Sequence, residues 1–176
     1  MKIFERENIA RTSDSPEVLA KLALDEEFFV RHKVAGNVHT SAETLSNLKN
    51  DIEWSVRAAV AENPNTSAEV LFYLHTDPDT DVRCNVVNNP SISPELLDFL
   101  ARDEEWSVRY CVAYNPHTSP ETLAKLAKDP EIEVRCQVAE NPNTPAEILA
   151  ELANQVLVCE KAKENLSRKQ AAEMSM

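Results

Sequence analysis

The chain has 176 residues, a length that suits one or two ordinary domains, and 43% of them are hydrophobic, which is enough for a substantial core. Its formal net charge is −12, and it contains ten prolines but one glycine. This composition argues against a β-rich fold with many tight turns, because such turns need glycine.

A unit of 26 residues recurs along the chain without insertion or deletion. Five complete copies occupy residues 15–144, and a sixth begins at residue 145. Residues 1–14 resemble a degenerate half-unit that would cap the N-terminal end. Because one such unit is too small to have a core of its own, we expect residues 15–153 to form an all-α solenoid of about six stacked repeats.

The first segment of each unit is predicted to be a helix with two buried leucines three residues apart, such as Leu71 and Leu74. A threonine precedes it, with a glutamate three residues further on, and this spacing predicts a capping box. The pairs are Thr40 with Glu43, Thr66 with Glu69, Thr118 with Glu121, and Thr144 with Glu147. We place Pro145 at the first helical position of its copy, where the missing N–H costs nothing.

The second segment opens with an aspartate and is also predicted to be helical. Two valines four residues apart, such as Val56 and Val60, lie on one face of it and belong to the core. An asparagine ends the segment, and in four copies a proline follows, which forces the preceding residue out of the α region.

Two polar columns in the second segment do not vary between copies. We interpret the arginines, among them Arg57, Arg83 and Arg109, as a structural ladder of partly buried ion pairs with a cap aspartate or a neighbouring glutamate. The alternative is a basic stripe for an anionic ligand, but a binding site should differ between repeats. The asparagines, among them Asn63, Asn89 and Asn115, are expected to bond the carbonyls exposed at a helix end.

The face opposite the valines varies between copies and carries several aromatic side chains. In helical solenoids one helix of each unit lines an extended groove that binds partners, and Trp, Tyr and Arg are common anchors in interfaces. The candidate binding residues are His32, Trp54, Trp106, Tyr110 and Tyr114. The alternative is that these aromatics pack against the adjacent repeat.

The end of the chain departs from the repeat. Residues 154–176 are expected to form a C-terminal capping helix followed by a frayed polar tail. The side chains expected to cover the last open face are Val156, Leu157, Cys159 and Leu166.

The pattern Asp-x4-Val-Arg-x2-Val-Ala-x-Asn-Pro-x-Thr-x2-Glu-x-Leu-x2-Leu-Ala resembles the leucine-rich repeat variant family of bacterial proteins. The copies nearest to it are residues 103–127 and 129–153. The resemblance implies a right-handed superhelix that alternates α and 3₁₀ helices, so either segment could be a 3₁₀ turn. One member of that family binds an iron–sulfur centre through N-terminal cysteines. Residues 1–14 contain no cysteine, so that cofactor is not carried over, and no cofactor is expected.

Catalytic and metal-binding patterns are missing from the sequence. It has no Gly-rich phosphate loop, no nucleophile elbow and no paired histidines on a helix. Its four histidines do not cluster, and Cys84 and Cys136 lie two units apart, about 20 Å by helix spacing. Zinc ligands must lie within about 2.3 Å of one ion. We therefore expect neither an enzyme nor a metal protein.

The charge points to the kind of partner. The repeats hold most of the excess of Asp and Glu, a surface that repels nucleic acid and attracts a basic protein. We predict a non-catalytic protein-interaction scaffold. The alternative is an acidic mimic of DNA that inhibits a nucleic-acid-binding protein. No apolar run approaches the roughly 20 residues that span a membrane, and the charged start does not resemble a secretory signal, so a cytoplasmic location is expected.

Overall fold

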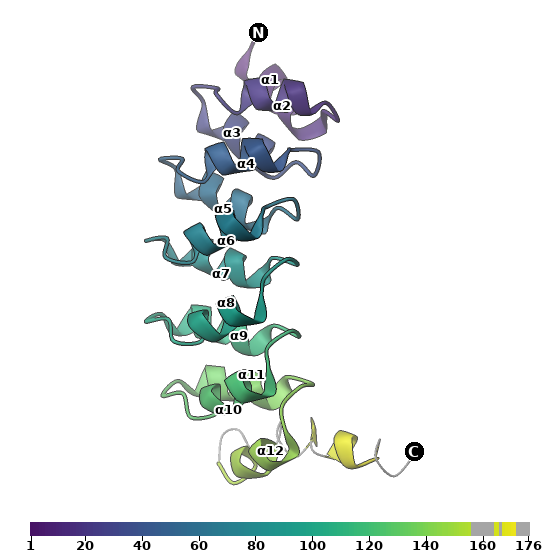
Figure 1. The fold of residues 1–176 in the computed structure, drawn as a ribbon, viewed down its shortest axis with the longest axis vertical. Coiled ribbons are helices and arrows are strands. Elements are labelled where there is room, and N and C mark those ends of the chain that lie inside the picture. Colours follow the sequence, from purple (N-terminus) through teal and green to yellow (C-terminus); the bar gives the residue numbers. More distant parts are fainter. Residues whose placement is uncertain (156–163, 166, 172–176) are drawn as a thin grey trace. The chain divides into compact units, whose positions relative to one another are not determined.

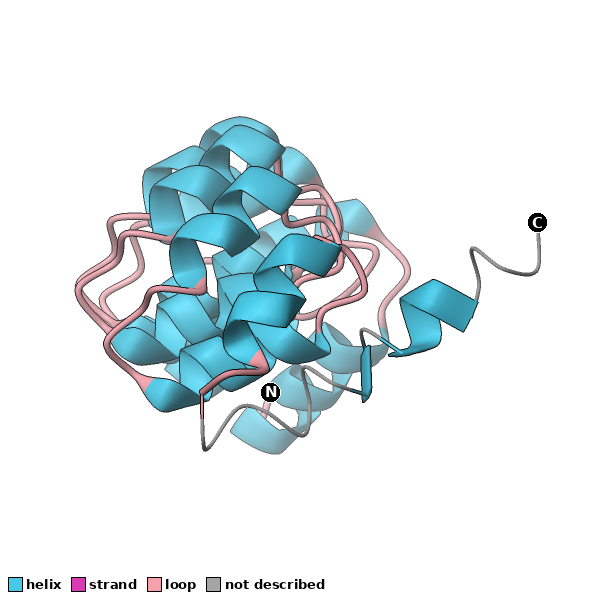
Figure 2. Ribbon diagram, turned by 90° about the horizontal axis from the view of Figure 1, so that it is seen from below, coloured by secondary structure: helices cyan, strands magenta, loops and turns pink. Residues whose placement is uncertain are grey.

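The computed structural model describes residues 1–155, 164–165 and 167–171. The chain divides into two compact units, Met1–Ser93 and Pro94–Met176. Over the described residues both units consist of helices joined by loops, without any strand (Figure 2). The predicted all-α helical-repeat fold is thereby confirmed.

The N-terminal unit alternates short helices of two kinds. Its helices are α1 (Ile3–Thr12), α2 (Pro16–Leu22), α3 (Phe28–Ala35), α4 (Ala42–Leu48), α5 (Trp54–Glu62), α6 (Ala68–Leu74) and α7 (Thr80–Asn88). The even-numbered helices are the predicted first segments and have seven residues each, whereas α3, α5 and α7 are the predicted second segments. Helix α1 precedes the first complete repeat and packs on α3.

The C-terminal unit continues the same alternation. Its helices are α8 (Pro94–Leu100), α9 (Trp106–Tyr114), α10 (Pro120–Leu126), α11 (Ile132–Glu140) and α12 (Ala146–Leu152). Residues 164–165 and 167–171 are helical as well. The four side chains predicted to cover the last repeat, at positions 156, 157, 159 and 166, lie outside the described residues.

Second-segment helices stack on one another within each unit. Helices α1, α3, α5 and α7 pack in succession through the N-terminal unit, and α9 packs on α11 in the C-terminal unit (Figure 1). The first-segment helices pack beside them, each against the second-segment helices next to it in sequence. Each repeat of 26 residues thus adds one second-segment helix to the stack within its unit.

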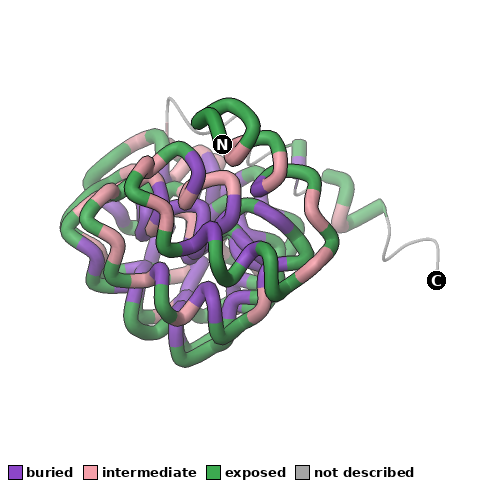
Figure 3. The backbone as a smooth tube through the Cα atoms, turned by 90° about the horizontal axis from the view of Figure 1, so that it is seen from above, coloured by how far each residue is buried: buried purple, intermediate pink, exposed green. Residues whose placement is uncertain are grey.

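The core of each unit consists of the predicted leucine and valine columns. Leu45 and Leu71 of the first segments are buried, as are Val56 and Val60 of α5, whose side chains have no exposed surface. Buried residues alternate with exposed ones along the backbone because each helix turns one face inward (Figure 3). The predicted core columns are confirmed.

The cap of the first segment lies one residue later than the capping box predicts. The N-cap residues of α2, α4, α6 and α10 are serines, and their hydroxyls accept hydrogen bonds from backbone amides three residues on, as Ser67 does from Val70 at 3.3 Å. Glu69 is then the second helical residue and not the third, so it does not close a capping box. Pro145 is likewise the N-cap of α12 and not its first residue.

The threonines that precede these N-cap residues bind the preceding helix instead. The hydroxyl of Thr118 is buried and donates to the carbonyl oxygen of Val112 at 2.6 Å, and Thr144 does the same to Val138. These bonds satisfy carbonyls near the end of the preceding second-segment helix. Ile92, which occupies this column in the fourth copy, is buried as well and fills the space without the hydroxyl.

Both segments of each described repeat are α-helices, so the α alternative applies where the family resemblance left 3₁₀ open. The aspartate that opens the second segment lies two residues before the N-cap. Asp51 accepts a hydrogen bond from the amide of Glu53 at 3.0 Å and so fixes the turn that leads into α5. Equivalent bonds recur at Asp25, Asp103 and Asp129.

Candidate protein-binding surface

The arginine column forms ion pairs between successive repeats. Arg57 donates through Nε and Nη2 to the two carboxylate oxygens of Asp77, 20 residues later, at 2.6 and 2.8 Å. Its Nη1 donates to the carbonyl oxygen of Asp51 at 2.8 Å. Arg31 binds Asp51 in the same way, and Arg109 binds Asp129.

Two arginines of the column show other contacts. Arg83 is buried on α7 and donates to the carbonyl oxygen of Asp77 at 2.8 Å. Arg135 binds the side-chain oxygen of Gln155 at 2.8 Å, so a neutral amide stands where other repeats have a carboxylate. These contacts give each arginine a structural partner inside its own unit.

Proton equilibria of the pairs reflect this geometry. The hydrogen bond with Asp77 raises the pKa of Arg57, while burial opposes the rise. Burial alone would raise the pKa of Asp51, but hydrogen bonds from Arg31 and from the amide of Glu53 outweigh it, and the net pKa is lowered. Both groups therefore stay charged at neutral pH, and the column offers few donors to a ligand.

The asparagine column connects each repeat to the one before it. The side-chain nitrogen of Asn63 donates to the carbonyl oxygens of Ala35 at 2.7 Å and Asn37 at 2.9 Å, which lie 28 and 26 residues earlier. Its side-chain oxygen accepts from the amide of Asn65 at 2.9 Å. The side-chain nitrogen thus makes two hydrogen bonds and the side-chain oxygen makes one, and the side chain is buried.

Other members of the column repeat this arrangement. Asn89 and Asn141 bind the corresponding carbonyls, and Asn115 is buried at the end of α9, where it accepts from the amide of His117. Asn165 binds the carbonyl oxygens of Ala139 and Asn141. Sequence reasoning missed Asn165 because it comes 24 residues after Asn141 instead of 26.

The predicted aromatic residues of the C-terminal unit lie on one face of α9. Trp106, Tyr110 and Tyr114 are spaced four residues apart, and 45%, 36% and 63% of their respective surfaces are exposed. The rings of Trp106 and Tyr110 meet edge to face with centroids 6.4 Å apart. Val108 and Val112 on the other face are fully buried, so the helix is anchored from behind.

A cavity of about 360 Å³ opens beside this aromatic face. It lies between α9 and α11, and its walls are Tyr110, Ile132, Glu133, Cys136, Gln137 and Glu140. The ionisable carboxylates on its wall are Glu133 and Glu140, and no lysine or arginine of the described residues lines it. This charge favours a cationic ligand.

The predicted residues of the N-terminal unit are arranged differently. Trp54 begins α5 and is 46% exposed, whereas His32 is half-buried on α3. Burial and the charge of Lys33 lower the pKa of His32, although Glu62 partly opposes this, so the ring is neutral at pH 7. Ala58, the next residue along the predicted face of α5, is buried, so α5 carries no continuous aromatic strip.

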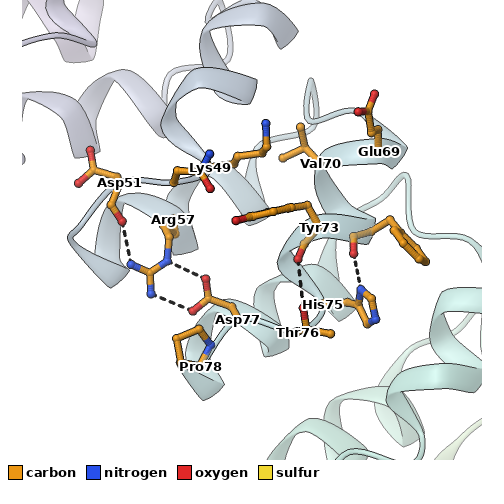
Figure 4. A pocket seen from close by; sticks show the side chains of 12 residues that line it. Lys49, Asp51, Arg57, Glu69, Val70, Tyr73, His75, Thr76, Asp77 and Pro78 are labelled. Atoms are coloured by element: carbon orange, nitrogen blue, oxygen red, sulfur yellow. Dashed lines mark hydrogen bonds and ion pairs between the residues drawn. The ribbon is translucent and has the colours of Figure 1, made fainter.

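The N-terminal unit has a groove of about 660 Å³ on its first-segment side, which sequence reasoning missed (Figure 4). Phe72 and Tyr73 of α6 are exposed beside it, and the ammonium group of Lys49 lies 5.5 Å from the centre of the Tyr73 ring. The paired Arg57 and Asp77 lie in its wall, as the dashed lines of Figure 4 show.

A signal for this groove exists in the sequence. The position of Tyr73 varies between repeats and holds Lys, Asn, Tyr, Phe, Lys and Glu in the six copies. Variation at exposed first-segment positions is the same criterion that singled out the second-segment face. Phe72 and Tyr73 lie on the first-segment helix α6, so the second-segment face does not include them.

Other kinds of site find no support among the described residues. No group of three or more His, Cys, Asp or Glu side chains there could hold a metal ion. None of the described helices has both the length and the apolar character that crossing a bilayer requires. Cys84, Cys111 and Cys136 are thiols and not disulfides.

Comparison with known proteins agrees with the repeat pattern. The family model described as leucine rich repeat variant matches residues 54–79 and 132–156. Each match begins with a second-segment helix and runs through the next first-segment helix, that is, α5 with α6 and α11 with α12. The predicted resemblance is confirmed at these two repeats. No curated protein matches the chain in sequence.

Three solved structures show where the same fold occurs. One, described as a leucine-rich repeat variant with a novel repetitive protein structural motif, is 27% identical with a TM-score of 0.57, over 94% of this chain and 77% of that chain. The condensin Cnd3–Cnd2 subcomplex of S. pombe is 18% identical with a TM-score of 0.59, over 91% of this chain and 28% of that one. The E. coli protein YibA is 17% identical with a TM-score of 0.56, over 96% and 93%. The last two show a shared helical fold alone.

Proposed function

We propose that this chain, an array of leucine-rich repeat variant repeats, is a non-catalytic scaffold that binds a partner protein through the aromatic face of α9. The observation that carries the proposal is the exposure of Trp106, Tyr110 and Tyr114 on a helix whose opposite face is fully buried. Aromatic side chains held on a rigid support are the usual anchors of protein interfaces, because they bury much area and lose little conformational entropy.

Charge favours a basic partner. Residues 94–155 contain twelve Asp and Glu but five Lys and Arg. Of these five, Arg109 is paired with Asp129, which further reduces the positive charge available at the surface. A negative surface speeds the approach of a basic protein and repels competing acidic ones. Thiols that stay reduced suit the cytoplasm, which is the compartment we propose.

The experiment is an affinity pull-down with the intact chain, followed by identification of the retained protein and measurement of its affinity for variants. We expect Tyr114→Ala to weaken the affinity at least about ten-fold, as loss of an aromatic anchor does, and to leave the unfolding midpoint unchanged. Phe4→Ala is the matched control, because Phe4 is 75% exposed on α1 and belongs to the N-terminal unit, whereas α9 belongs to the C-terminal unit. Equal affinity of the Tyr114→Ala and Phe4→Ala variants would refute the proposal.

The same assay separates the scaffold from an acidic mimic of DNA, which the net charge of −12 favours. A partner held by mimicry would bind nucleic acid competitively and would tolerate Tyr114→Ala, because its contacts would be with carboxylates. A partner held by the aromatic face would lose affinity with that variant whether or not nucleic acid is present.

A further inference from the structure

The cavity between α9 and α11 is lined by a largely buried glutamine whose side chain makes no hydrogen bond to the described residues. Gln137 is 93% buried, since its relative exposure is 7%. Nothing among the described residues makes a hydrogen bond to its side chain, although its backbone oxygen bonds Asn141.

The amide of Gln137 faces the cavity. Among the described residues, every side-chain nitrogen or oxygen that is shut off from the surroundings has a hydrogen-bond partner. The Gln137 amide makes no such bond, so its polar end must border open space, and the open space that Gln137 lines is this cavity. It therefore points a donor and an acceptor at whatever enters.

At the corresponding place between α5 and α7 of the N-terminal unit, the amide has a hydrogen-bond partner. There Asn85 stands 52 residues before Gln137, and its side-chain nitrogen donates to the carbonyl oxygen of Ala58 at 3.2 Å. Ala58 in turn stands where the C-terminal unit has Tyr110. The unsatisfied amide and the aromatic wall are thus particular to the α9–α11 pair and are not a general property of the repeat.

The walls of the cavity define the chemistry of its ligand. Ile132 and Cys136 offer an apolar surface, the ring of Tyr110 offers a π-face, and Glu133 offers an exposed carboxylate at the rim. A long side chain with a positive end suits all of these, because its stem packs on the apolar wall while its head meets the ring and the carboxylate. The volume of about 360 Å³ lies near the lower end for small-molecule pockets, which suits a single side chain.

We propose that this cavity binds a lysine or arginine side chain of the partner protein, with Gln137 Oε1 and Glu133 accepting from its cationic head and Tyr110 stacking on it. The inference rests on the proposed scaffold function and identifies the residue class that the scaffold recognises. Trp106 and Tyr114 flank this cavity along α9 and provide the surrounding apolar contacts.

The test uses a probe that needs no partner protein. N-acetyl-arginine amide is titrated at low salt into the intact ¹⁵N-labelled chain, and NMR follows the side-chain amide signals of Gln137 together with the backbone amide signals of α9 and α11. The backbone signals report binding in the Gln137→Leu variant. We expect saturable shifts of these signals. Glu133→Gln and Gln137→Leu should each weaken binding about ten-fold, because each removes an acceptor for a charged donor.

Two controls make the result decisive. N-acetyl-norleucine amide has the stem without the charge and should produce no saturable shift. Asp81→Asn alters the residue equivalent to Glu133 in the N-terminal unit and should leave the affinity for the arginine probe unchanged. The backbone amide spectrum of each variant shows whether it is folded, and Glu133 is exposed, so its substitution should not disturb the core.

The inference is overturned if the arginine probe causes no shift at Gln137, if the norleucine probe binds equally well, or if both variants bind as the unaltered chain does. Failure of the scaffold function has a different signature, which is the absence of any partner whose affinity depends on Tyr114. A partner that depends on Tyr114 but tolerates Glu133→Gln and Gln137→Leu would keep the scaffold and remove the cationic pocket.

Discussion

At the scale of single residues, the arginine column illustrates how a partly buried charge is tolerated. Only 14% of the Arg57 side chain and 4% of the Asp77 side chain are exposed. Removing two charges from water is costly, and the attraction between them offsets this cost only when the remaining hydrogen-bonding positions are filled. Here they are, because the guanidinium bonds both carboxylate oxygens and a backbone carbonyl.

Replacing Arg57 should therefore destabilise the fold. We expect Arg57→Met to lower the free energy of unfolding by about 3 kcal/mol, since Asp77 would remain as a buried charge without its partner. Urea denaturation followed by circular dichroism measures the loss. Arg102→Met is the control, because the pair of Arg102 with Asp98 is exposed and should contribute less than about 1 kcal/mol. Equal losses for the two variants would contradict the structural role of Arg57.

The same pairs predict how stability depends on pH. The folded-state pKa values of Asp25 and Asp51 lie below their ordinary value of 3.8. Carboxylates of this kind stabilise the fold fully at pH values above 3.8, and their contribution is lost as the pH falls below it. The urea concentration at the midpoint of unfolding, measured from pH 7 to pH 2.5, should decrease as the pH falls below 3.8. In the Asp51→Asn variant this decrease should be smaller. A midpoint that stays constant down to pH 2.5 would contradict the assignment.

At the scale of the helical elements, the asparagine column fixes where each second-segment helix ends. Asn63 is the C-cap of α5, and its amide satisfies carbonyls at the end of α3, one repeat earlier. Carbonyls at helix ends have no partner inside their own helix. The carbonyls at the end of each second-segment helix thus receive their hydrogen bonds from the next repeat. The same contacts hold the two repeats together.

Substitution of this amide tests the connection. We expect Asn63→Ala to lower the free energy of unfolding by about 2 to 3 kcal/mol, because it leaves buried carbonyls of α3 without a donor. Asn47→Ala is the matched control, since Asn47 is exposed on α4. Amide hydrogen exchange in the turn after Ala35 should accelerate in the first variant and not in the second. Similar exchange in both would argue against the inter-repeat role.

How much the sequence revealed differs between elements. The leucine and valine columns identified the core correctly, because burial follows the helical period. The first-segment cap was misplaced by one residue, since threonine and serine stand side by side and both are good caps. Only the structure shows that Thr118 turns inward to Val112, which leaves the cap to Ser119.

Candidate binding residues were less accessible to sequence reasoning. The spacing of Trp106, Tyr110 and Tyr114 placed them on one face, but their exposure depends on which neighbours pack there. Gln137 carried no sequence signal, because a glutamine on a variable helix face is ordinary, and only its burial without a partner makes it informative. The groove beside Tyr73 depends likewise on how α4 and α6 are placed in space.

At the scale of the whole molecule, contacts at fixed separations in sequence join neighbouring repeats within each unit. Arginine reaches aspartate 20 residues later, and asparagine reaches carbonyls 26 and 28 residues earlier. These offsets are the same in both units, where Arg109 and Asn141 repeat them. Stability is therefore expected to be a sum over neighbouring repeats, as in other repeat proteins.

Deletion of a whole repeat tests this expectation. Without residues 41–66, Arg31 would stand 20 residues before Asp77, and Asn89 would stand 26 residues after Asn37, so every contact could form again. We expect this shortened chain to remain folded and helical with a modest fall in melting temperature. Deletion of residues 41–60 should instead prevent folding of the N-terminal unit, because none of the offsets that span the deletion is kept: the separation of Asn63 from Ala35 falls from 28 residues to eight. The same circular dichroism melt for both deletions would contradict the account.

The opposite reach of the two polar columns has a consequence for how the protein is made. A nascent chain leaves the ribosome with its N-terminus first, so the carbonyls that Asn63 needs are already present when Asn63 emerges. Arg57 must wait until Asp77 has been synthesised, 20 residues later. During translation each new repeat can dock at once through its asparagine, while the arginine of the youngest repeat still lacks its carboxylate and has only the backbone carbonyl six residues earlier. At Arg135 that wait ends with the neutral Gln155, which accepts the guanidinium without a carboxylate.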